Sequence, residues 1–220
     1  MYEPLWVRGI VLSVSQLGEY DKRMVVLTEQ LGKITIFANG ARRQNNRFTA
    51  VAQSFTMGRF QLRPGNQAYT LTGAEIERPF LELSGDMEGY TSAAYCCELT
   101  DYFTREGVGG SDELNLLYVT FLSLLEERLP FSVIRSAFAL KLLHIEGEAP
   151  EMQEPAIARY ILEQPIGRTF SFEVKDQGAR ELERVVKKEL DRVLDYPLRS
   201  EGILASLADL RTGPETSPVG

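Results

Sequence analysis

The segment Lys33-Ile34-Thr35-Ile36-Phe37-Ala38 decides the fold of the first 80 residues. It alternates with a period of two and places Ile34 and Ile36 on one face, which is typical of a half-buried β-strand. Further β-rich runs lie on both sides of it, at residues 6–14, 24–28, 54–62 and 69–76. Five short strands in about 75 residues indicate a small closed barrel such as an OB-fold, because a curled sheet removes its own exposed edges.

The fourth of these runs contains a change of apolar parity. Phe55 and Met57 occupy odd positions before Gly58, whereas Phe60 and Leu62 occupy even positions after it. One extra residue in a strand turns the following side chains to the opposite face. The pattern therefore predicts a β-bulge at Gly58, which would help the sheet to curl.

After residue 80 the apolar period changes from 2 to 3.6, the period of an amphipathic helix. The predicted helices cover residues 86–105, a segment that Ser111-Asp112-Glu113 caps and Pro130 stops, a segment from Ser132 to Glu146, residues 178–195 and a short stretch after Pro197. The sequence thus predicts an α+β multidomain chain. We expect residues 1–80 to form a five-stranded OB-fold domain, residues 81–210 an all-α helical bundle, and residues 211–220 a flexible tail.

The net charge of −7 is distributed unequally between these two parts. Residues 1–80 carry 10 Lys+Arg against 6 Asp+Glu, a net charge of +4. Residues 81–220 carry 14 against 25, a net charge of −11. This split indicates a first half that meets polyanions and a second half that does not. A mildly basic surface without such a partner is the alternative.

A basic loop follows the third strand at residues 40–48. It has three arginines, Arg42, Arg43 and Arg47, and no acidic residue. Arginine donates in a fork to phosphate, and OB-folds hold single strands with loops beside the barrel face. The loop is therefore a candidate DNA contact, and an ordinary solvated loop is the alternative.

Other barrel residues extend this prediction. Lysines and arginines of the neighbouring strands are expected to neutralise further phosphates, namely Lys22, Arg23 and Lys33. Tyr20 and Phe48 are candidate stacking faces for bases, whereas Phe37 is expected to be buried.

Signals for catalysis and metal binding are weak. No phosphate-binding loop, nucleophile elbow or zinc-protease motif is present in the sequence. His144 lies in an apolar helix and is expected to be packed there. Cys96 and Cys97 are adjacent in a helix, so their side chains diverge by about 100° and are expected to be buried thiols instead of a zinc pair. We expect no enzyme activity, no metal, no cofactor and no small-molecule substrate.

The sequence also indicates a location. No apolar run approaches the roughly 18–20 residues of a membrane helix, and the first residues lack a secretory signal. Two cysteines cannot build a disulfide framework. We expect a reduced cytoplasmic protein without a membrane partner.

Lys141 is unusual in the helical half. On a helical wheel it falls within the apolar stripe of its neighbours Ile134, Ala137, Phe138 and Ile145. A charge there must snorkel, find an acid or receive a partner's anion. An apolar groove with one lysine would suit a peptide that ends in hydrophobic residues and a free carboxylate. Arg135 of the same helix is the second candidate for partner binding.

Several short blocks resemble the RecO family of bacterial recombination mediators. The resemblance is densest in the first 45 residues and returns weakly near the end of the chain. The blocks are residues 9–12, 17–22, 27–33, 38–43, 138–143 with Gly147 and Pro150, and 198–200.

The resemblance implies an N-terminal OB-fold, a C-terminal helical domain and no catalytic activity. It implies binding of single- and double-stranded DNA, annealing of complementary strands, and contacts with RecR and with the acidic, hydrophobic tail of single-stranded DNA-binding protein. With these partners such a protein would help to load RecA during recombinational DNA repair, in the cytoplasm and associated with the nucleoid. Arg42, Arg43 and Arg47 then become DNA contacts, and the groove around Lys141 a candidate site for the tail peptide.

One departure from the family pattern affects the prediction. Many relatives carry a four-cysteine zinc motif just after the positions of Gly147 and Pro150, but residues 151–161 contain no cysteine. We therefore expect no zinc, and the structure of residues 151–175 stays open, as does the RecR contact. A non-catalytic adaptor, whose barrel and helices dock other subunits, is the competing interpretation, and the acidic second half favours it.

Overall fold

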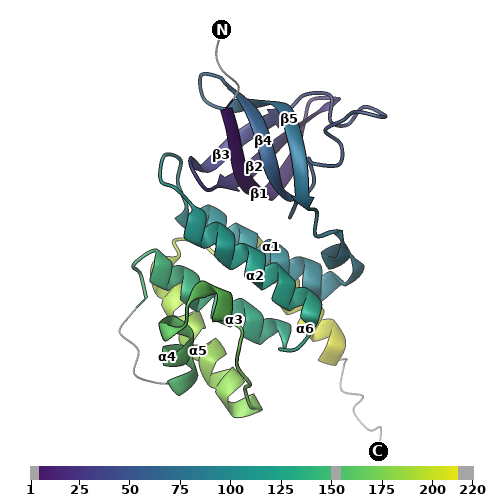
Figure 1. Ribbon diagram of the computed structural model, residues 1–220. Coiled ribbons are helices and arrows are strands. Elements are labelled where there is room, and N and C mark those ends of the chain that lie inside the picture. The colour runs from purple at the N-terminus through teal and green to yellow at the C-terminus, as the bar shows by residue number, and fades with distance from the viewer. Residues whose placement is uncertain (1–4, 150–154, 213–220) are drawn as a thin grey trace, which may run out of the picture.

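The computed structural model describes residues 5–149 and 155–212 and places five strands before the helices (Figure 1). The strands are β1 (Leu5–Leu17), β2 (Asp21–Thr28), β3 (Gly32–Ala38), β4 (Met57–Pro64) and β5 (Tyr69–Arg78). They close into a barrel in the order β1-β2-β3-β5-β4, in which β3 and β5 are parallel and the other pairs antiparallel. This confirms the predicted five-stranded OB-type barrel.

Where the helices cover the barrel, its wall is apolar both on the inner face and on the outer face that packs against the helices. Ile34 and Ile36 lie in the barrel interior, as their alternation predicts. In β1 the interior residues are Val7 and Val11, whereas Ile10 packs into the helical core. The side chains at even positions of β1, Ile10 and Leu12, therefore attach the barrel to the helices.

The bulge predicted at Gly58 is present. The register between β4 and β5 shifts between Met57 and Gly58. Met57 belongs to the helical core, and Phe60 belongs to the barrel interior, so the parity switch moves side chains between two cores. A Cβ at Gly58 would lie 2.4 Å from the carbonyl oxygen of Glu75, and this close approach of two backbones requires glycine.

The second half of the chain is helical. Its elements are η1 (Leu81–Gly85), α1 (Met87–Phe103), α2 (Ser111–Glu126), α3 (Phe131–Ile145), α4 (Ala156–Glu163), η2 (Ile166–Arg168), α5 (Asp176–Val193) and α6 (Arg199–Thr212). Figure 1 shows α1 and α2 directly below the barrel and α3, α4 and α5 farther from it.

The helix boundaries differ from the prediction at four places. Gly110 is the N-cap of α2, so Ser111 is its first residue. Pro130 precedes α3 and does not end α2, because a proline without an N–H suits the start of a helix. The helix α4 was not predicted. The helix α6 is longer than the predicted short stretch and continues into the predicted tail, whose residues 213–220 lie outside the described residues.

Aromatic rings join the barrel to the helices. Phe121 of α2 packs edge-on against Phe55, with ring centroids 5.3 Å apart, and against Phe80, with centroids 5.2 Å apart. Phe55 and Phe80 both have positive φ values, 69° and 49°. Such backbone strain persists only where the surroundings over-determine it. The ring cluster therefore holds the two halves in one relative orientation.

A backbone clamp reinforces this junction. The segment between α1 and α2 lies along the β2–β3 turn and exchanges hydrogen bonds with it. Gly107 N donates to Leu31 O at 2.9 Å, Lys33 N to Arg105 O at 3.2 Å and Gly110 N to Thr28 O at 3.2 Å. Because these bonds satisfy both backbones, the turn and the connecting segment stabilise each other.

Candidate nucleic-acid interface

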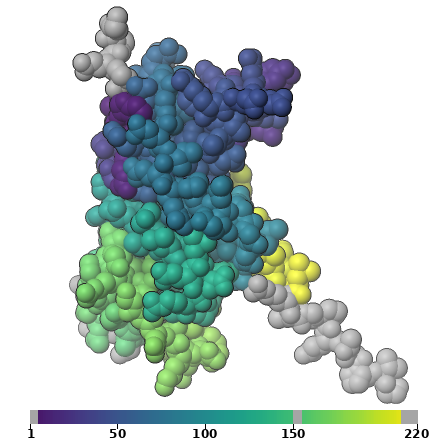
Figure 2. Space-filling model, turned by 45° about the vertical axis from the view of Figure 1, so that its right-hand side comes forward, coloured from purple at the N-terminus to yellow at the C-terminus, as the bar shows by residue number. Residues whose placement is uncertain are grey.

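The basic loop between β3 and β4 is anchored on the β1–β2 turn. Arg42 N donates to Tyr20 O at 2.9 Å, and Arg42 Nη1 donates to Glu19 O at 2.9 Å. Gly40 N donates to Asp21 Oδ1 at 2.7 Å. These bonds fix the start of the loop to the barrel. Figure 2 shows the dark-purple and dark-blue residues of this end of the barrel projecting together from the surface.

The other two arginines of the loop lie over aromatic rings. The guanidinium of Arg43 lies 4.7 Å from the ring centroid of Tyr20, and that of Arg47 lies 4.6 Å from the ring centroid of Phe48. Arg47 Nη2 also donates to Thr72 O at 2.8 Å. All three loop arginines are exposed. Because each guanidinium has five N–H donors, donors remain for phosphate while the side chain stays oriented.

The aromatic residues near the loop differ from expectation. Tyr20 is 41% exposed and offers an open edge. Phe48 is buried, with Arg47 over its ring, so it offers no open face for a base. Phe37 is half-buried, whereas the sequence predicted a buried ring.

The three strand cations predicted as phosphate contacts have different surroundings. Lys22 Nζ donates to Ala52 O at 2.7 Å, and burial together with the charge of Arg42 lowers the pKa of this amine. Lys33 Nζ lies 3.0 Å from Asp101 Oδ1 and also donates to the backbone oxygen of Asp101. Arg23 is exposed. Of the three, Arg23 has the most open side chain.

A row of side chains crosses four strands of the outer barrel face. Arg23 pairs with Phe37, Phe37 pairs with Thr70, and Thr70 pairs with Arg63. Directly opposed residues of neighbouring strands point to the same face, so the row carries an arginine at each end and a half-buried ring between them. The sequence analysis missed Arg63. Its position beside the Pro64-Gly65 turn, where OB-folds contact ligands, was the available signal.

Lys141, predicted as a partner site, lies inside the helical half. It is 5% exposed, and its Nζ donates to Ile161 O at 3.3 Å, Leu162 O at 2.9 Å and Gln164 O at 2.6 Å. These are carbonyls at the C-terminal end of α4, where a cation is favourable. The expected groove is therefore filled by α4, a helix that the sequence analysis did not predict.

Arg135, the other residue predicted to bind a partner, is also engaged within the chain. Its Nη1 donates to Ser92 Oγ at 2.7 Å and lies 3.8 Å from Glu88 Oε1. Both contacts are with α1. Arg135 therefore joins α3 to α1.

The remaining titratable candidates do not form a metal centre. Cys96 and Cys97 are buried as predicted, and burial raises the pKa of both thiols. His144 is exposed in the last turn of α3, so the expectation of a packed histidine is wrong. Within residues 5–149 and 155–212, no group of three His, Cys, Asp or Glu side chains could hold a metal ion. No helix in these ranges is long and apolar enough to span a membrane.

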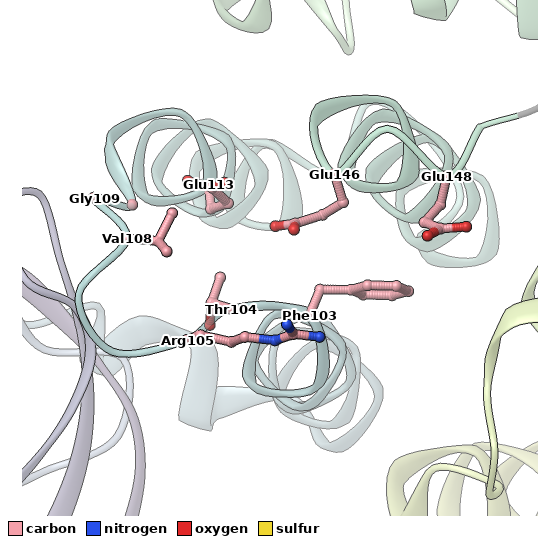
Figure 3. Close-up of a pocket in the computed structure, with 9 residues that line it drawn as sticks. Phe103, Thr104, Arg105, Val108, Gly109, Glu113, Glu146 and Glu148 are labelled. Atoms are coloured by element: carbon pink, nitrogen blue, oxygen red, sulfur yellow. The ribbon is translucent and has the colours of Figure 1, made fainter.

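A pocket of about 300 Å³ lies beside the N-terminal end of α2. Figure 3 shows the carboxylate of Glu146 extending toward Glu113, with Arg105 across the opening. Burial, reinforced by the neighbouring charge and hydrogen bond of Glu113, raises the pKa of Glu146 to about 7, although Arg105 opposes the shift. Glu146 thus keeps its proton up to near neutral pH, hydrogen-bonded to Glu113.

Comparison with known families follows the same division of the chain. The family model for the N-terminal part of recombination protein O matches residues 2–80, and the model for its C-terminal part matches residues 84–158. The chain belongs to the RecO family. The N-terminal match contains the whole basic loop, and the C-terminal match ends inside α4.

Relatives named "DNA repair protein RecO" support this assignment. The protein from Alkaliphilus metalliredigens is 34% identical over 144 residues, which are 66% of this chain and 58% of that relative. The one from Symbiobacterium thermophilum is 39% identical over 148 residues, with 66% and 58% covered. The one from Desulforudis audaxviator is 29% identical over 221 residues, with 96% and 86% covered. The chain spans less than two thirds of the length of the first two of these RecO relatives.

The described part of the cysteine-free segment has its own structure in this RecO-family chain. Residues 155–175 contain α4 and η2, and residues 150–154 lie outside the described residues. The Tyr160 hydroxyl donates to Ser171 O at 2.9 Å, and the rings of Tyr160 and Phe172 pack edge-on with centroids 6.2 Å apart. The segment is therefore held by packing and by the Lys141 contacts.

Proposed function

We propose that this chain is a DNA-binding recombination mediator. It binds and anneals single-stranded DNA and helps to load a recombinase onto that DNA during recombinational repair. Family membership and the names of the relatives, which are DNA repair proteins, support the repair role. The observation that carries the binding role is the set of three exposed loop arginines held on the barrel by carbonyls and rings.

Arginines that are already oriented lose little side-chain entropy when they bind phosphate, so the loop is suited to this ligand. Binding releases condensed counterions, which supplies sequence-independent affinity. The lowered pKa of Lys22, caused by burial and then by Arg42, is consistent with a local positive potential at the loop. The phosphate contacts that we propose are Arg42, Arg43, Arg47 and Arg23. Lys22 adds positive charge beside the loop, whereas the charge of Lys33 is offset by Asp101.

Annealing follows from the same surface. Two complementary strands repel each other through their phosphates, and a basic surface that binds both lowers this repulsion. Base pairing then completes the reaction. We include double-stranded DNA, RecR and the tail of single-stranded DNA-binding protein among the partners, and RecA loading as an indirect result. These partners rest on the family relationship, and a role on chromosomal DNA would place the chain at the nucleoid.

The test is fluorescence anisotropy of a labelled oligothymidylate at several salt concentrations. The test protein is the triple variant Arg42→Ala, Arg43→Ala, Arg47→Ala. The matched control removes three exposed arginines from the helical half, Arg159, Arg180 and Arg184. Each phosphate neutralised on a single strand contributes about −0.7 to the log–log salt slope, so loss of the loop should flatten the slope by about 2. The control should retain the wild-type slope.

The adaptor interpretation predicts a different result. If the wild-type chain does not bind the oligonucleotide at low salt, or if the loop and control variants bind equally well, the mediator proposal is overturned. The net charge of −11 in residues 81–220 would then favour a chain that docks other protein subunits.

A further inference from the structure

A groove of about 900 Å³ lies between the outer face of β2 and β3 and the helices α1 and α6. Its barrel wall includes Arg23, Val25 and Thr35. The opposite side, called here the helix wall, includes Tyr90 of α1 and Tyr196 of the connection between α5 and α6. In Figure 2 the barrel end projects above the yellow α6, and the surface is hollowed between them. The face of strands 2 and 3 is where OB-folds bind oligonucleotides, so the helices cover part of a ligand-binding face.

The helix wall offers aromatic surface to a ligand. Tyr196 is 58% exposed and Tyr90 is 41% exposed, although tyrosine rings usually find cover in a folded chain. The rings of Tyr196 and Tyr102 pack edge-on with centroids 5.4 Å apart, which orients the exposed ring. Base–aromatic stacking is the interaction by which sequence-independent single-strand binders hold successive bases.

The acidic residues of the groove are engaged by neighbouring donors. Asp101 is paired with Lys33. Glu98 accepts hydrogen bonds from the backbone of Arg199 and from Ser200. Glu106 is hydrogen-bonded to the Tyr69 side chain. Because these partners neutralise or satisfy the carboxylates, their repulsion of a phosphate chain is reduced, while Arg23 on one rim and Arg199 on the other are exposed cations.

The groove begins close to the point where the basic loop is anchored on β2. Asp21, which accepts the hydrogen bond from Gly40 at the start of the loop, is the first residue of β2 and stands two residues before Arg23. The row of Arg23, Phe37, Thr70 and Arg63 begins at the same point. A strand held by the loop arginines can therefore continue across Arg23 into the groove.

We propose that this groove binds a short segment of single-stranded DNA, with bases stacked on Tyr196 and Tyr90 and with phosphates near Arg23 and Arg199. The proposal rests on the proposed function, because the loop must bring the strand to the groove. A paired and stacked base has no free face for Tyr196. The groove therefore selects single strands, whereas the loop arginines meet the phosphates of single strands and duplexes alike.

The test compares a labelled oligothymidylate with a labelled duplex of the same length in anisotropy titrations. Tyr196→Ala should weaken single-strand binding about tenfold, the loss expected for one stacked base, and leave duplex binding unchanged. Tyr196→Phe keeps the ring and should bind like the wild type. Met87→Ala, an exposed apolar truncation on α1 outside the lining of the groove, is the control. Thermal unfolding of each variant checks that α6 remains folded.

The outcomes separate the two proposals. If the wild type binds neither probe, the proposed function fails and the groove fails with it. If the loop triple variant loses both probes but Tyr196→Ala binds both like the wild type, the groove inference alone is overturned. Equal weakening of both probes by Tyr196→Ala overturns the selection of single strands.

Discussion

Glu98 of α1 caps the N-terminus of α6 through Ser200, 102 residues away in the sequence. Ser200 N donates to Glu98 Oε2 at 3.0 Å, and Ser200 Oγ donates to the same oxygen at 2.7 Å. The other oxygen, Oε1, accepts from Arg199 N at 2.8 Å. The carboxylate thus satisfies two of the N–H groups that every helix leaves unpaired at its start. It attaches the last described helix to the helix that lies below the barrel.

The first prediction concerns this cap. Burial disfavours the charge of Glu98, but the hydrogen bonds from Ser200 and Arg199 outweigh it and lower the pKa. A lowered folded-state pKa means that the stabilisation is present above the ordinary value of about 4.3 and is lost as the pH falls through the folded value. Glu98→Gln should lower the free energy of unfolding at neutral pH by about 1 kcal/mol, as for other cap losses.

Urea denaturation at neutral pH and in acid measures this effect. Glu163→Gln, an exposed substitution on α4, is the control and should unfold like the wild type. The wild type and Glu98→Gln should converge in acid, where Glu98 is protonated. A constant difference at every pH would contradict the role of the ionised carboxylate.

The second prediction concerns Lys141. Lys141→Met keeps the length of the side chain but removes the donor to the three carbonyls at the end of α4. Buried acceptors left without donors cost about 1–3 kcal/mol, so this variant should be destabilised and α4 should exchange its amide hydrogens faster. Because Lys141 is buried, DNA affinity should not change. A variant that folds normally but loses affinity would place Lys141 in a binding site.

The regular elements of the fold could be predicted from local patterns. The alternation of Ile34 and Ile36 and the parity switch at Gly58 report directly on which face each side chain occupies. Lys141 could be predicted only in part. The helical wheel correctly placed it as a cation within an apolar stripe, but its partners are the backbone carbonyls at the end of α4, 20 or more residues later in the sequence. A contact that depends on where another helix docks leaves no local periodic signal.

In the candidate site, too, local sequence predicts some features, whereas contacts between distant segments cannot be predicted from it. The composition of the loop identified Arg42, Arg43 and Arg47 as exposed cations. It did not indicate that Lys33 is paired with Asp101, because that contact depends on how the helices sit against the barrel. That orientation rests on rings such as Phe121 and on backbone contacts between distant segments. The groove between the halves is a product of the same docking and could not be seen in the sequence.

The third prediction is a pH dependence that originates in the pocket of Figure 3. The pKa of Glu146 is raised to about 7, mainly by burial and then by Glu113. A carboxyl whose folded pKa is raised binds more protons in the native state. The contribution of Glu146 to stability therefore falls as the pH rises from about 4.5 to about 7 and is level above that. Glu113→Gln removes the neighbouring charge. It should stabilise the protein at about pH 8 and have little effect at about pH 5.

Urea denaturation across this range measures the third prediction. Glu148→Gln is the control, because Glu148 lines the same pocket but is not among the groups that shift the pKa of Glu146. The control should keep the pH dependence of the wild type. If Glu113→Gln keeps it as well, Glu113 does not contribute to the raised pKa of Glu146.

The last prediction tests the clamp between the barrel and the helices at Gly32. This residue has a φ of 65°, and a Cβ there would lie 2.1 Å from Val108 O and 2.2 Å from Arg105 O. Gly32→Ala combines an unfavourable backbone conformation with displacement of the connecting segment, so it should lower the free energy of unfolding by more than about 1 kcal/mol. Gly85→Ala, where an added Cβ meets open space, is the control. Hydrogen exchange at Gly107 N and Gly110 N should accelerate in Gly32→Ala before the barrel strands exchange, because these amides donate to the turn that the new methyl group would push away. Protection equal to the wild type at both amides would show that the clamp does not depend on glycine.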